Sequence, residues 1–213
     1  MTASIVVWGA GGHANVVVDA IRVAGAGKVE ALYDDVSTDG VAERHGLPVW
    51  RDPDRLRERA ARGDALLHVA VGDCAARARI AASARAMGFE LLSIRHPAAV
   101  VSPSAQVGAG AFLAAGSVVG PSARVGAGVI VNTRASVDHD CAVDDWAHVA
   151  PGATLGGRVE VGRESWIGLG ASVREGVRIG ARAMIGAGAV VLRDIGDDLL
   201  AYGVPARIIR RLR

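Results

Sequence analysis

The sequence is poor in lysine and in aromatic residues. Only Lys28 among the 24 basic residues is a lysine, aromatic residues make up 4% of the chain, and the formal net charge is +2. Basic residues do not alternate with aromatic ones, as they do where a surface stacks on bases. The composition therefore argues against a nucleic-acid partner.

Long apolar runs are absent, and cysteines are few. Although 51% of the residues are hydrophobic, no apolar stretch approaches the ~20 residues that span a bilayer, so no membrane partner is expected. The chain opens without the basic and apolar segments of a secretory signal. Cys74 and Cys141 lie far apart in the sequence and are interpreted as reduced packing residues. We expect a cytoplasmic protein.

A six-residue repeat fills the second half of the chain. Aliphatic residues occupy every sixth position from Val101 to Val191, and two positions before each stands a small or β-branched residue. Glycine follows the aliphatic residue in half of the repeats. No α-helix has this period, whereas short strands joined by sharp corners do, so the pattern predicts a parallel β-helix. Three repeats close one triangular coil, and residues three repeats apart stack on each other.

The first half of the chain has a different pattern. Apolar runs at Ser4–Trp8 and Val29–Tyr33 enclose a segment, 13–24, with helical spacing. Further strands and helices alternate up to about residue 94, which predicts a small Rossmann-like parallel sheet of the α/β class. The glycine turn after the first run, Gly9-x-Gly11-x-x-Ala14, resembles a phosphate-binding turn. It indicates either a nucleotide site or a structural tight turn.

The domain boundaries follow from these patterns. His96-Pro97 separates the two halves, because proline disfavours helix before it and the repeat begins directly afterwards. We therefore expect an α/β domain over 1–95, a β-helix over 96–192 and a carboxy-terminal tail over 193–213.

The repeat identifies a candidate catalytic histidine. His139 falls two residues after an aliphatic repeat position, at an outward corner, and Gly157 stacks next to it one coil later. Asp138 and Asp140 flank His139, and a carboxylate beside an imidazole fixes its tautomer and raises its basicity. The alternative is a solvated corner histidine among acidic residues. His148 also faces outward, and it could instead serve a contact between subunits.

A metal site is not expected. The histidine-based zinc sites of some hexapeptide-repeat proteins need three converging histidines. Beyond the domain boundary this chain has only His139 and His148, which belong to different columns of the repeat.

Motifs along nearly the whole chain resemble those of one family, the bacterial nucleotide-sugar acyltransferases. This group includes UDP-4-amino-sugar and GDP-perosamine N-acetyltransferases and sialic-acid O-acetyltransferases. The motifs are Val7-Trp8-Gly9-Ala10-Gly11-Gly12-His13, Tyr33-Asp34-Asp35, Val71-Gly72-Asp73 with Arg77, His96-Pro97, Val131-Asn132, Asp138-His139-Asp140, Ala147-His148-Val149 and Gly203-Val204-Pro205-Ala206. The resemblance implies a left-handed β-helix, a homotrimer, acetyl-CoA as co-substrate and an active site between neighbouring subunits.

The resemblance also implies roles for individual residues. His139 takes the place of the catalytic histidine, Asp140 that of its acidic neighbour, and the Gly157 backbone that of the donor to the thioester oxygen. At Asp140 the sequence departs from a relative that carries glutamate. The implied nucleotide-sugar contacts are Gly11, Gly12, His13, Asp34, Asp35 and Asn132. The implied acetyl-CoA contacts are His148, Gly157, Leu169, Ala187 and Pro205 in the tail.

These observations predict acetyl transfer from acetyl-CoA to the amine of a nucleotide-linked amino sugar, in the first place a 4-amino-4,6-dideoxy sugar. His139 would act as general base in a direct attack, since no outward cysteine or serine stands beside it as a nucleophile. The alternatives are O-acetylation of a sialic acid, a nucleotide-binding scaffold without turnover, and an NAD-linked oxidoreductase. The missing third glycine of the turn argues against the last of these. The sequence leaves the sugar, the base and the acetylated position open.

Overall fold

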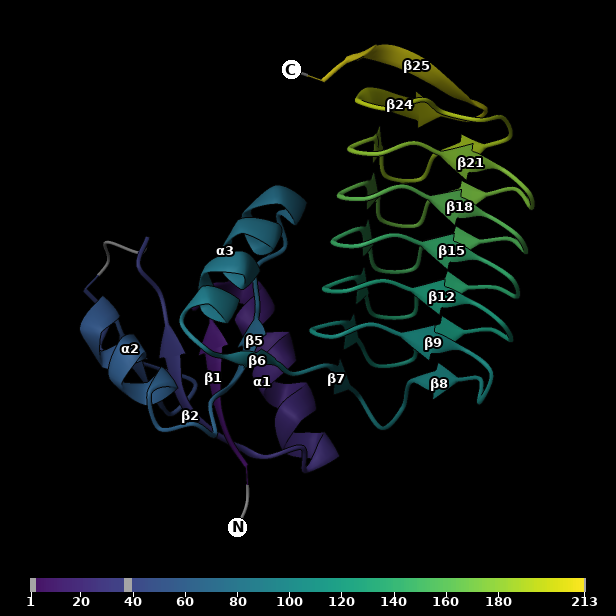
Figure 1. Ribbon diagram of the computed structural model, residues 1–213. Helices are drawn as coiled ribbons and strands as arrows, with labels where there is room; N and C mark the ends of the chain where they lie inside the picture. Colours follow the sequence, from purple (N-terminus) through teal and green to yellow (C-terminus); the bar gives the residue numbers. More distant parts are fainter. Residues whose placement is uncertain (1–2, 37–39, 213) are drawn as a thin grey trace. The chain divides into compact units, whose positions relative to one another are not determined.

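The structure is a computed structural model that describes residues 3–36 and 40–212 (Figure 1). The chain divides into two compact units, Met1–Pro97 and Ala98–Arg213. No helix within the described ranges combines the length and the apolar character that a membrane crossing requires.

The amino-terminal unit is a six-stranded sheet with the strand order β3-β4-β2-β1-β5-β6. All neighbours are parallel except the β3–β4 hairpin. The strands are β1 (Ser4–Trp8), β2 (Lys28–Tyr33), β3 (Glu43–Arg44), β4 (Leu47–Trp50), β5 (Leu66–Val69) and β6 (Glu90–Leu91), and β7 (Ile94–Arg95) follows near the end of the unit. The helices are α1 (Gly12–Ala24), α2 (Pro53–Ala60) and α3 (Cys74–Ala86).

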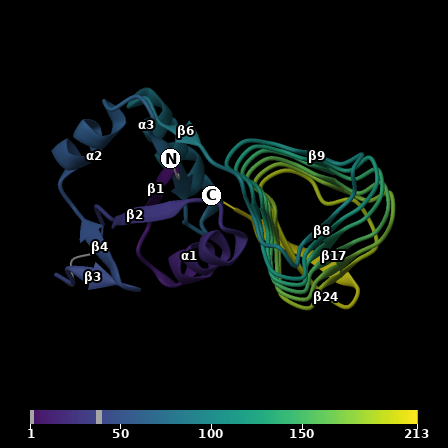
Figure 2. The ribbon, with the colours of Figure 1, turned by 90° about the horizontal axis from the view of Figure 1, so that it is seen from below.

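Helices cover both faces of this sheet, which explains its apolar strands. Figure 2 shows α1 on one side of the sheet and α2 and α3 on the other. Ile5, Val6 and Val7 of β1 are therefore fully buried although their side chains alternate between the two faces. The carboxyl ends of the central parallel strands meet at one edge of the sheet, where the glycine turn after β1 also lies.

The second unit is a parallel β-helix whose coils enclose a triangular column (Figure 2). Each coil contributes one two-residue strand to each of three faces. Face 1 consists of β10 (Phe112–Leu113), β13 (Ile130–Val131), β16 (His148–Val149), β19 (Trp166–Ile167) and β22 (Met184–Ile185). Face 2 consists of β8 (Val100–Val101), β11 (Val118–Val119), β14 (Ser136–Val137), β17 (Thr154–Leu155), β20 (Ser172–Val173) and β23 (Val190–Val191). Face 3 consists of β9 (Gln106–Val107), β12 (Arg124–Val125), β15 (Ala142–Val143), β18 (Glu160–Val161) and β21 (Arg178–Ile179).

The inward repeat positions form the core of the column. From Leu113 to Val191 the aliphatic repeat residues are at most 3% exposed. The two earlier repeat positions are more open, Val101 half-buried and Val107 38% exposed, because they lie on the first coil and their strands end faces 2 and 3. The expected fold class, an α/β domain followed by a left-handed parallel β-helix, is confirmed.

The corners require one residue with left-handed backbone at a fixed place in the repeat. Glycine occupies it at Gly152 and Gly170, but Asp140 and Arg158 adopt the same conformation, with φ of 59° and 60°. Non-glycine residues are uncommon in this region, and aspartate tolerates it better than most. The sharp corner therefore dictates the direction in which the Asp140 side chain leaves the backbone.

The tail continues the β-helix instead of leaving it. β24 (Leu199–Gly203) pairs in parallel with β22 and extends face 1. It then turns through the cis peptide bond Val204–Pro205 into β25 (Ala206–Arg211), which pairs with it antiparallel.

Candidate active site

His139 and Asp140 form a hydrogen-bonded pair at the corner between faces 2 and 3. The imidazole Nδ1 lies 2.8 Å from Asp140 Oδ2. Because a carboxylate only accepts, Nδ1 carries the proton and donates it to Asp140, which leaves Nε2 with a free lone pair in the neutral ring. Asp138 Oδ1 accepts from the His139 backbone N–H at 2.7 Å. The shorter side chain of Asp140, compared with glutamate, therefore still reaches the imidazole.

The His139 ring lies directly over Gly157 on the next coil. A Cβ atom built on Gly157 would lie 2.6 Å from His139 Cε1 and would also overlap Nε2. No side chain fits at position 157 unless the ring moves. Among the described residues the Gly157 backbone N–H has no acceptor. The lone pair on His139 Nε2 and the unused backbone N–H of Gly157 thus lie side by side at this corner.

Asn132 and His148 form a second polar pair, near the edge between faces 1 and 2. The Thr133 backbone N–H donates to Asn132 Oδ1 at 2.8 Å, so the Asn132 amide nitrogen is the group that faces His148 Nε2 at 3.0 Å. Nε2 therefore accepts, and a neutral His148 carries its proton on Nδ1. His148 is only 4% exposed, and its ring packs against Trp166 with the centroids 4.1 Å apart.

Leu169 and Ala187 lie on that same edge, in a column that begins at Pro151. The Pro151 carbonyl accepts from Gly170 N–H at 3.0 Å, and the Leu169 carbonyl accepts from Gly188 N–H at 2.8 Å. Within the described chain the N–H groups of Leu169 and Ala187 have no acceptor. Leu169 is 55% exposed. The edge thus offers a row of unused backbone donors beside an exposed apolar side chain.

One chain therefore does not bring all of these residues together. His139 and Gly157 lie where face 2 meets face 3, whereas Leu169 and Ala187 lie where face 1 meets face 2. The two edges are separated by the width of face 2. Pro205 lies apart from both pairs, in the β24–β25 turn.

The glycine turn of the amino-terminal unit is built around Gly9. Its φ is 120°, and a Cβ there would lie 2.7 Å from the Ala70 carbonyl oxygen, so the turn requires glycine. Gly11 and Gly12 have open space where a side chain would stand, and Gly11 precedes α1 without a side-chain cap. His13 is half-buried in the first turn of that helix.

Asp34 and Asp35 follow β2 at the same edge of the sheet but are used differently. The Asp34 carboxylate accepts from the backbone N–H groups of Ala10 and Val36, both at 3.0 Å, and so ties the glycine turn to the end of β2. Asp35 is exposed, and its carboxylate faces the Trp8 indole N–H at 3.4 Å. Asp35 is thus the freer of the two carboxylates to meet a ligand.

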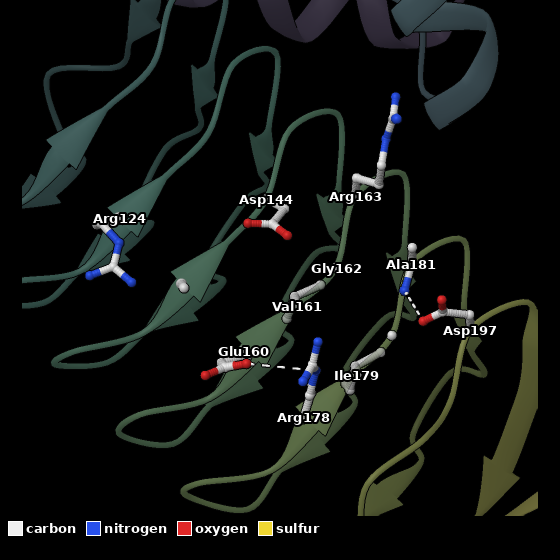
Figure 3. A pocket seen from close by; sticks show the side chains of 12 residues that line it. Arg124, Asp144, Glu160, Val161, Gly162, Arg163, Arg178, Ile179, Ala181 and Asp197 are labelled. Atoms are coloured by element: carbon white, nitrogen blue, oxygen red, sulfur yellow. Dashed lines mark hydrogen bonds and ion pairs between the residues drawn. The ribbon is translucent and has the colours of Figure 1, made fainter.

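A hollow of about 440 Å³ lies elsewhere, on face 3. Figure 3 shows Glu160 and Arg178 side by side among the residues that line it, with Arg178 Nε 3.7 Å from Glu160 Oε2. It contains none of the expected site residues, and its mixed charges favour no ligand. Within the described residues no group of three or more His, Cys, Asp or Glu side chains is arranged to hold a metal ion.

Two residues near the site were not singled out for these contacts in the sequence. Trp166 packs on His148 because β16 and β19 pair in register. The three-repeat spacing between the two residues contained this signal. Cys141, which the sequence marks only as packing, is fully buried and donates its thiol proton to the Gly156 carbonyl.

Comparison with known proteins identifies relatives over the whole chain. Residues 4–84 match the family described as the PglD N-terminal domain, and residues 158–193 match the bacterial transferase hexapeptide (six repeats). The comparison with curated proteins gave no match.

Three solved structures illustrate the similarity. A His-to-Asn variant of perosamine N-acetyltransferase from Caulobacter crescentus, in complex with CoA and GDP-perosamine, is 40% identical, with a TM-score of 0.92 and 97% of each chain covered. The acetyltransferase domain of PglB from Neisseria gonorrhoeae, in complex with acetyl coenzyme A, is 36% identical, with a TM-score of 0.90 and coverage of 98% of this chain and 100% of that one. WeeI from Acinetobacter baumannii is 25% identical, with a TM-score of 0.87 and coverage of 96% and 99%.

Proposed function

We propose that this chain, which belongs to the hexapeptide-repeat nucleotide-sugar acyltransferases, acetylates the amine of a nucleotide-linked amino sugar. It is an acyltransferase with acetyl-CoA as co-substrate. The proposed acceptor is a 4-amino-4,6-dideoxy sugar, the class to which perosamine belongs. The observation that carries the proposal is the His139 ring over Gly157, in a chain 40% identical to perosamine N-acetyltransferase over 97% of its length.

His139 is the proposed general base. Its Nδ1 proton is held by Asp140 at 2.8 Å, so the lone pair on Nε2 points away from the carboxylate and accepts a proton from the attacking amine. Asp140 stabilises the imidazolium that results, because the two charges are then hydrogen-bonded to each other. The ring is 47% exposed, so the proton can pass on to water.

Gly157 is the proposed oxyanion donor. Its unused N–H is the group that would donate to the thioester oxygen as negative charge develops there, and a donor of this kind is worth about 10²–10³ in rate. Acetyl-CoA supplies the activated acyl group and a thiolate leaving group. Cys141, the nearest cysteine in sequence, is fully buried, which favours direct attack by the amine over an acyl-enzyme.

The edge between faces 1 and 2, on which Leu169 and Ala187 lie and which we call the Leu169 edge, is the proposed site for the arm of acetyl-CoA. Its unused N–H groups at Leu169 and Ala187 suit the amide carbonyls of a pantetheine chain, and the exposed Leu169 side chain offers apolar contact. His148 and Asn132, which contact each other at 3.0 Å, lie near this edge and are the proposed polar residues beside the bound cofactor. Pro205 in the tail is the proposed contact farther along.

The separation of the two edges supports a site shared between copies. The width of face 2 separates an acetyl-CoA that lies along the Leu169 edge from the His139 of the same chain. A neighbouring copy in a closed ring brings its own His139 to this edge, and we propose a homotrimer on that basis. Each site then combines two chains.

Subunit mixing tests the shared site. His139→Ala and Leu169→Arg chains, each inactive alone, are co-expressed with different tags and the mixed trimers are purified. Each purified mixed trimer has one of its three sites with both residues intact, so activity should return to about one third of the wild-type level. Mixed assemblies that stay as inactive as both parents would show that the site lies within one chain. Light scattering on the wild-type protein measures the number of copies.

The amino-terminal unit is the proposed binding site for the nucleotide, at the glycine turn and Asp35. Gly11, Gly12 and His13 offer the start of α1 to a phosphate group. Asp35→Ala should raise the KM for the sugar substrate and leave the KM for acetyl-CoA unchanged. Asp34→Ala is the contrasting variant. Because Asp34 bonds two backbone N–H groups, we expect it to lower stability as well.

CoA release with a panel of acceptors tests the function itself. UDP-, GDP- and dTDP-linked 4-amino sugars are compared with sialic acid, whose acetyl-accepting groups are hydroxyls. The amide or ester in the product is identified by mass spectrometry. His139→Ala should lower turnover by about 10²–10⁴-fold. His148→Ala should mainly weaken binding. Formation of an ester would count against an N-acetyltransferase, and so would a failure to release CoA with any acceptor in the panel.

A further inference from the structure

Cys141 lies directly behind the backbone of the candidate oxyanion site. Its side chain is fully buried, and its Sγ lies 3.1 Å from the Gly156 carbonyl oxygen. Burial raises the pKa of the Cys141 thiol, so the sulfur keeps its proton at neutral pH and acts as the donor. The contact therefore joins the thiol to the carbonyl of the residue that precedes Gly157.

The Gly156 carbonyl and the Gly157 N–H belong to one peptide unit. A trans peptide is planar, so these two groups point in opposite directions. With the Gly156 oxygen turned inward onto Cys141, the Gly157 N–H is turned outward, toward the side on which the His139 ring lies. A hydrogen bond accepted by a carbonyl also polarises the N–H of the same peptide and strengthens it as a donor, by roughly 10–30%.

The same corner lacks the bond that usually fixes this peptide. At many corners the equivalent carbonyl accepts from the backbone N–H three residues on, as Ala150 does from Ala153 at 3.1 Å. Gly156 has no such bond with any described residue. The thiol of Cys141 is the group that takes its place.

The next coil contains a matched arrangement that is remote from His139. Ser165, at the equivalent small inward position, donates to the Gly180 carbonyl at 2.6 Å. The peptide that follows has its N–H bonded to Asp197 Oδ1 at 2.9 Å, so it offers nothing to a ligand. Serine is therefore able to make this bond, and the bond by itself is a feature of the fold.

We propose that Cys141 is a positioning residue for the acetyl transfer, which holds and polarises the Gly156–Gly157 peptide so that the Gly157 N–H faces the thioester oxygen. The inference rests on the proposed function. In this role the Cys141 thiol acts through the backbone amide of Gly157 and does not contact the substrate.

The test compares Cys141→Ala, Cys141→Ser and Ser165→Ala. Alanine is tolerated at these positions, as Ala135 and Ala147 show in neighbouring repeats. A loss of 10–30% of a donor worth 10²–10³ in rate predicts a kcat about two- to eightfold lower for Cys141→Ala, with both KM values unchanged. Cys141→Ser should return kcat to within about twofold of the wild type. Ser165→Ala loses a matched buried bond and should keep its kcat.

A second readout does not depend on activity. In deuterated, ¹⁵N-labelled protein without substrate, the Gly157 amide proton should move upfield in Cys141→Ala, return in Cys141→Ser and stay in place in Ser165→Ala. An unmoved Gly157 resonance in Cys141→Ala, or an active enzyme in which this variant keeps its kcat, would overturn the inference. A wild-type protein that releases no CoA with any acceptor would instead overturn the proposed function, while the amide shift still decides whether the thiol acts on the peptide.

Discussion

Gly157→Ala tests the position of the His139 ring while leaving the stability of the fold intact. The new Cβ would stand 2.6 Å from His139 Cε1. Ordinary carbon contacts are about 3.5–4.0 Å, so the ring must retreat by roughly 1 Å. A displacement of this size at a reacting group costs about 10²-fold in rate. We therefore expect kcat to fall about 10²-fold, with the KM for the nucleotide sugar nearly unchanged.

The fold should tolerate the same change. The backbone of Gly157 is outside the left-handed region, and the His139 side chain is 47% exposed and free to turn into solvent. Replacing glycine by alanine at a compatible position stabilises a protein by about 0.4–1 kcal/mol. The melting temperature of the variant should therefore equal or exceed that of the wild type, which makes the expected loss of activity independent of unfolding.

The assay is CoA release at saturating substrates, measured for Gly157→Ala, for His139→Ala and for the double variant. In the His139→Ala background the clash is gone, so adding alanine at position 157 should change kcat little further. Two outcomes would refute the reasoning. One is a Gly157→Ala enzyme with near-normal kcat, and the other is a full additional loss in the double variant, which would mean that the backbone donor and not the ring had been disturbed.

Three further predictions concern stability. Burial lowers the pKa of His68 to about 4, so between pH 6.5 and 4 the unfolded chain binds a proton that the folded chain does not bind. The free energy of unfolding therefore falls as the pH is lowered through that window. In urea titrations His68→Gln should lose less stability than the wild type between pH 7 and pH 4. The Arg59 side chain is 2% exposed and pairs with Glu30 at 2.8 Å. Arg59→Leu should lower the free energy of unfolding, measured in urea, by about 2–3 kcal/mol. This is less than the usual loss for a broken buried pair, because Glu30 is partly exposed. Gly9→Ala, with a φ of 120° and a Cβ 2.7 Å from the Ala70 oxygen, should cost at least about 1–3 kcal/mol and lower the melting temperature.

The period of the sequence predicts the β-helix and the edge on which each corner residue stands. That is why His139 and Gly157 could be paired in advance, since stacking follows from a separation of three repeats. The period does not describe the conformation of single corner residues. The left-handed backbone of Asp140, which turns its carboxylate onto Nδ1, depends on the local corner geometry.

Other contacts depend on parts of the chain that the sequence does not connect. The resemblance implies Asp34 as a nucleotide-sugar contact, but the sequence does not reveal that its carboxylate also accepts from two backbone N–H groups, one of them from Ala10. The burial of His148 follows from packing against Trp166, which is not apparent from the histidine alone. The β24–β25 hairpin lies outside the repeat, so its pairing with β22 could not be read from the period.

Within each repeat the inward residues pack the core and the corner residues face solvent, which explains how such a site is compatible with a stable column. Inward positions such as Leu155 are fully buried and carry the packing, whereas the corner residue His139 is half-exposed and contributes little to the core. The side chain of a corner residue can therefore change its chemistry at little cost in stability. The exception is the peptide beneath the ring. A Cβ on Gly156 would lie 2.8 Å from the Glu175 backbone nitrogen, and one on Gly157 would strike His139. The two adjacent glycines are thus fixed for different reasons, one by the coil above and the other by the base, and together they keep a bare backbone N–H where the proposed reaction requires it.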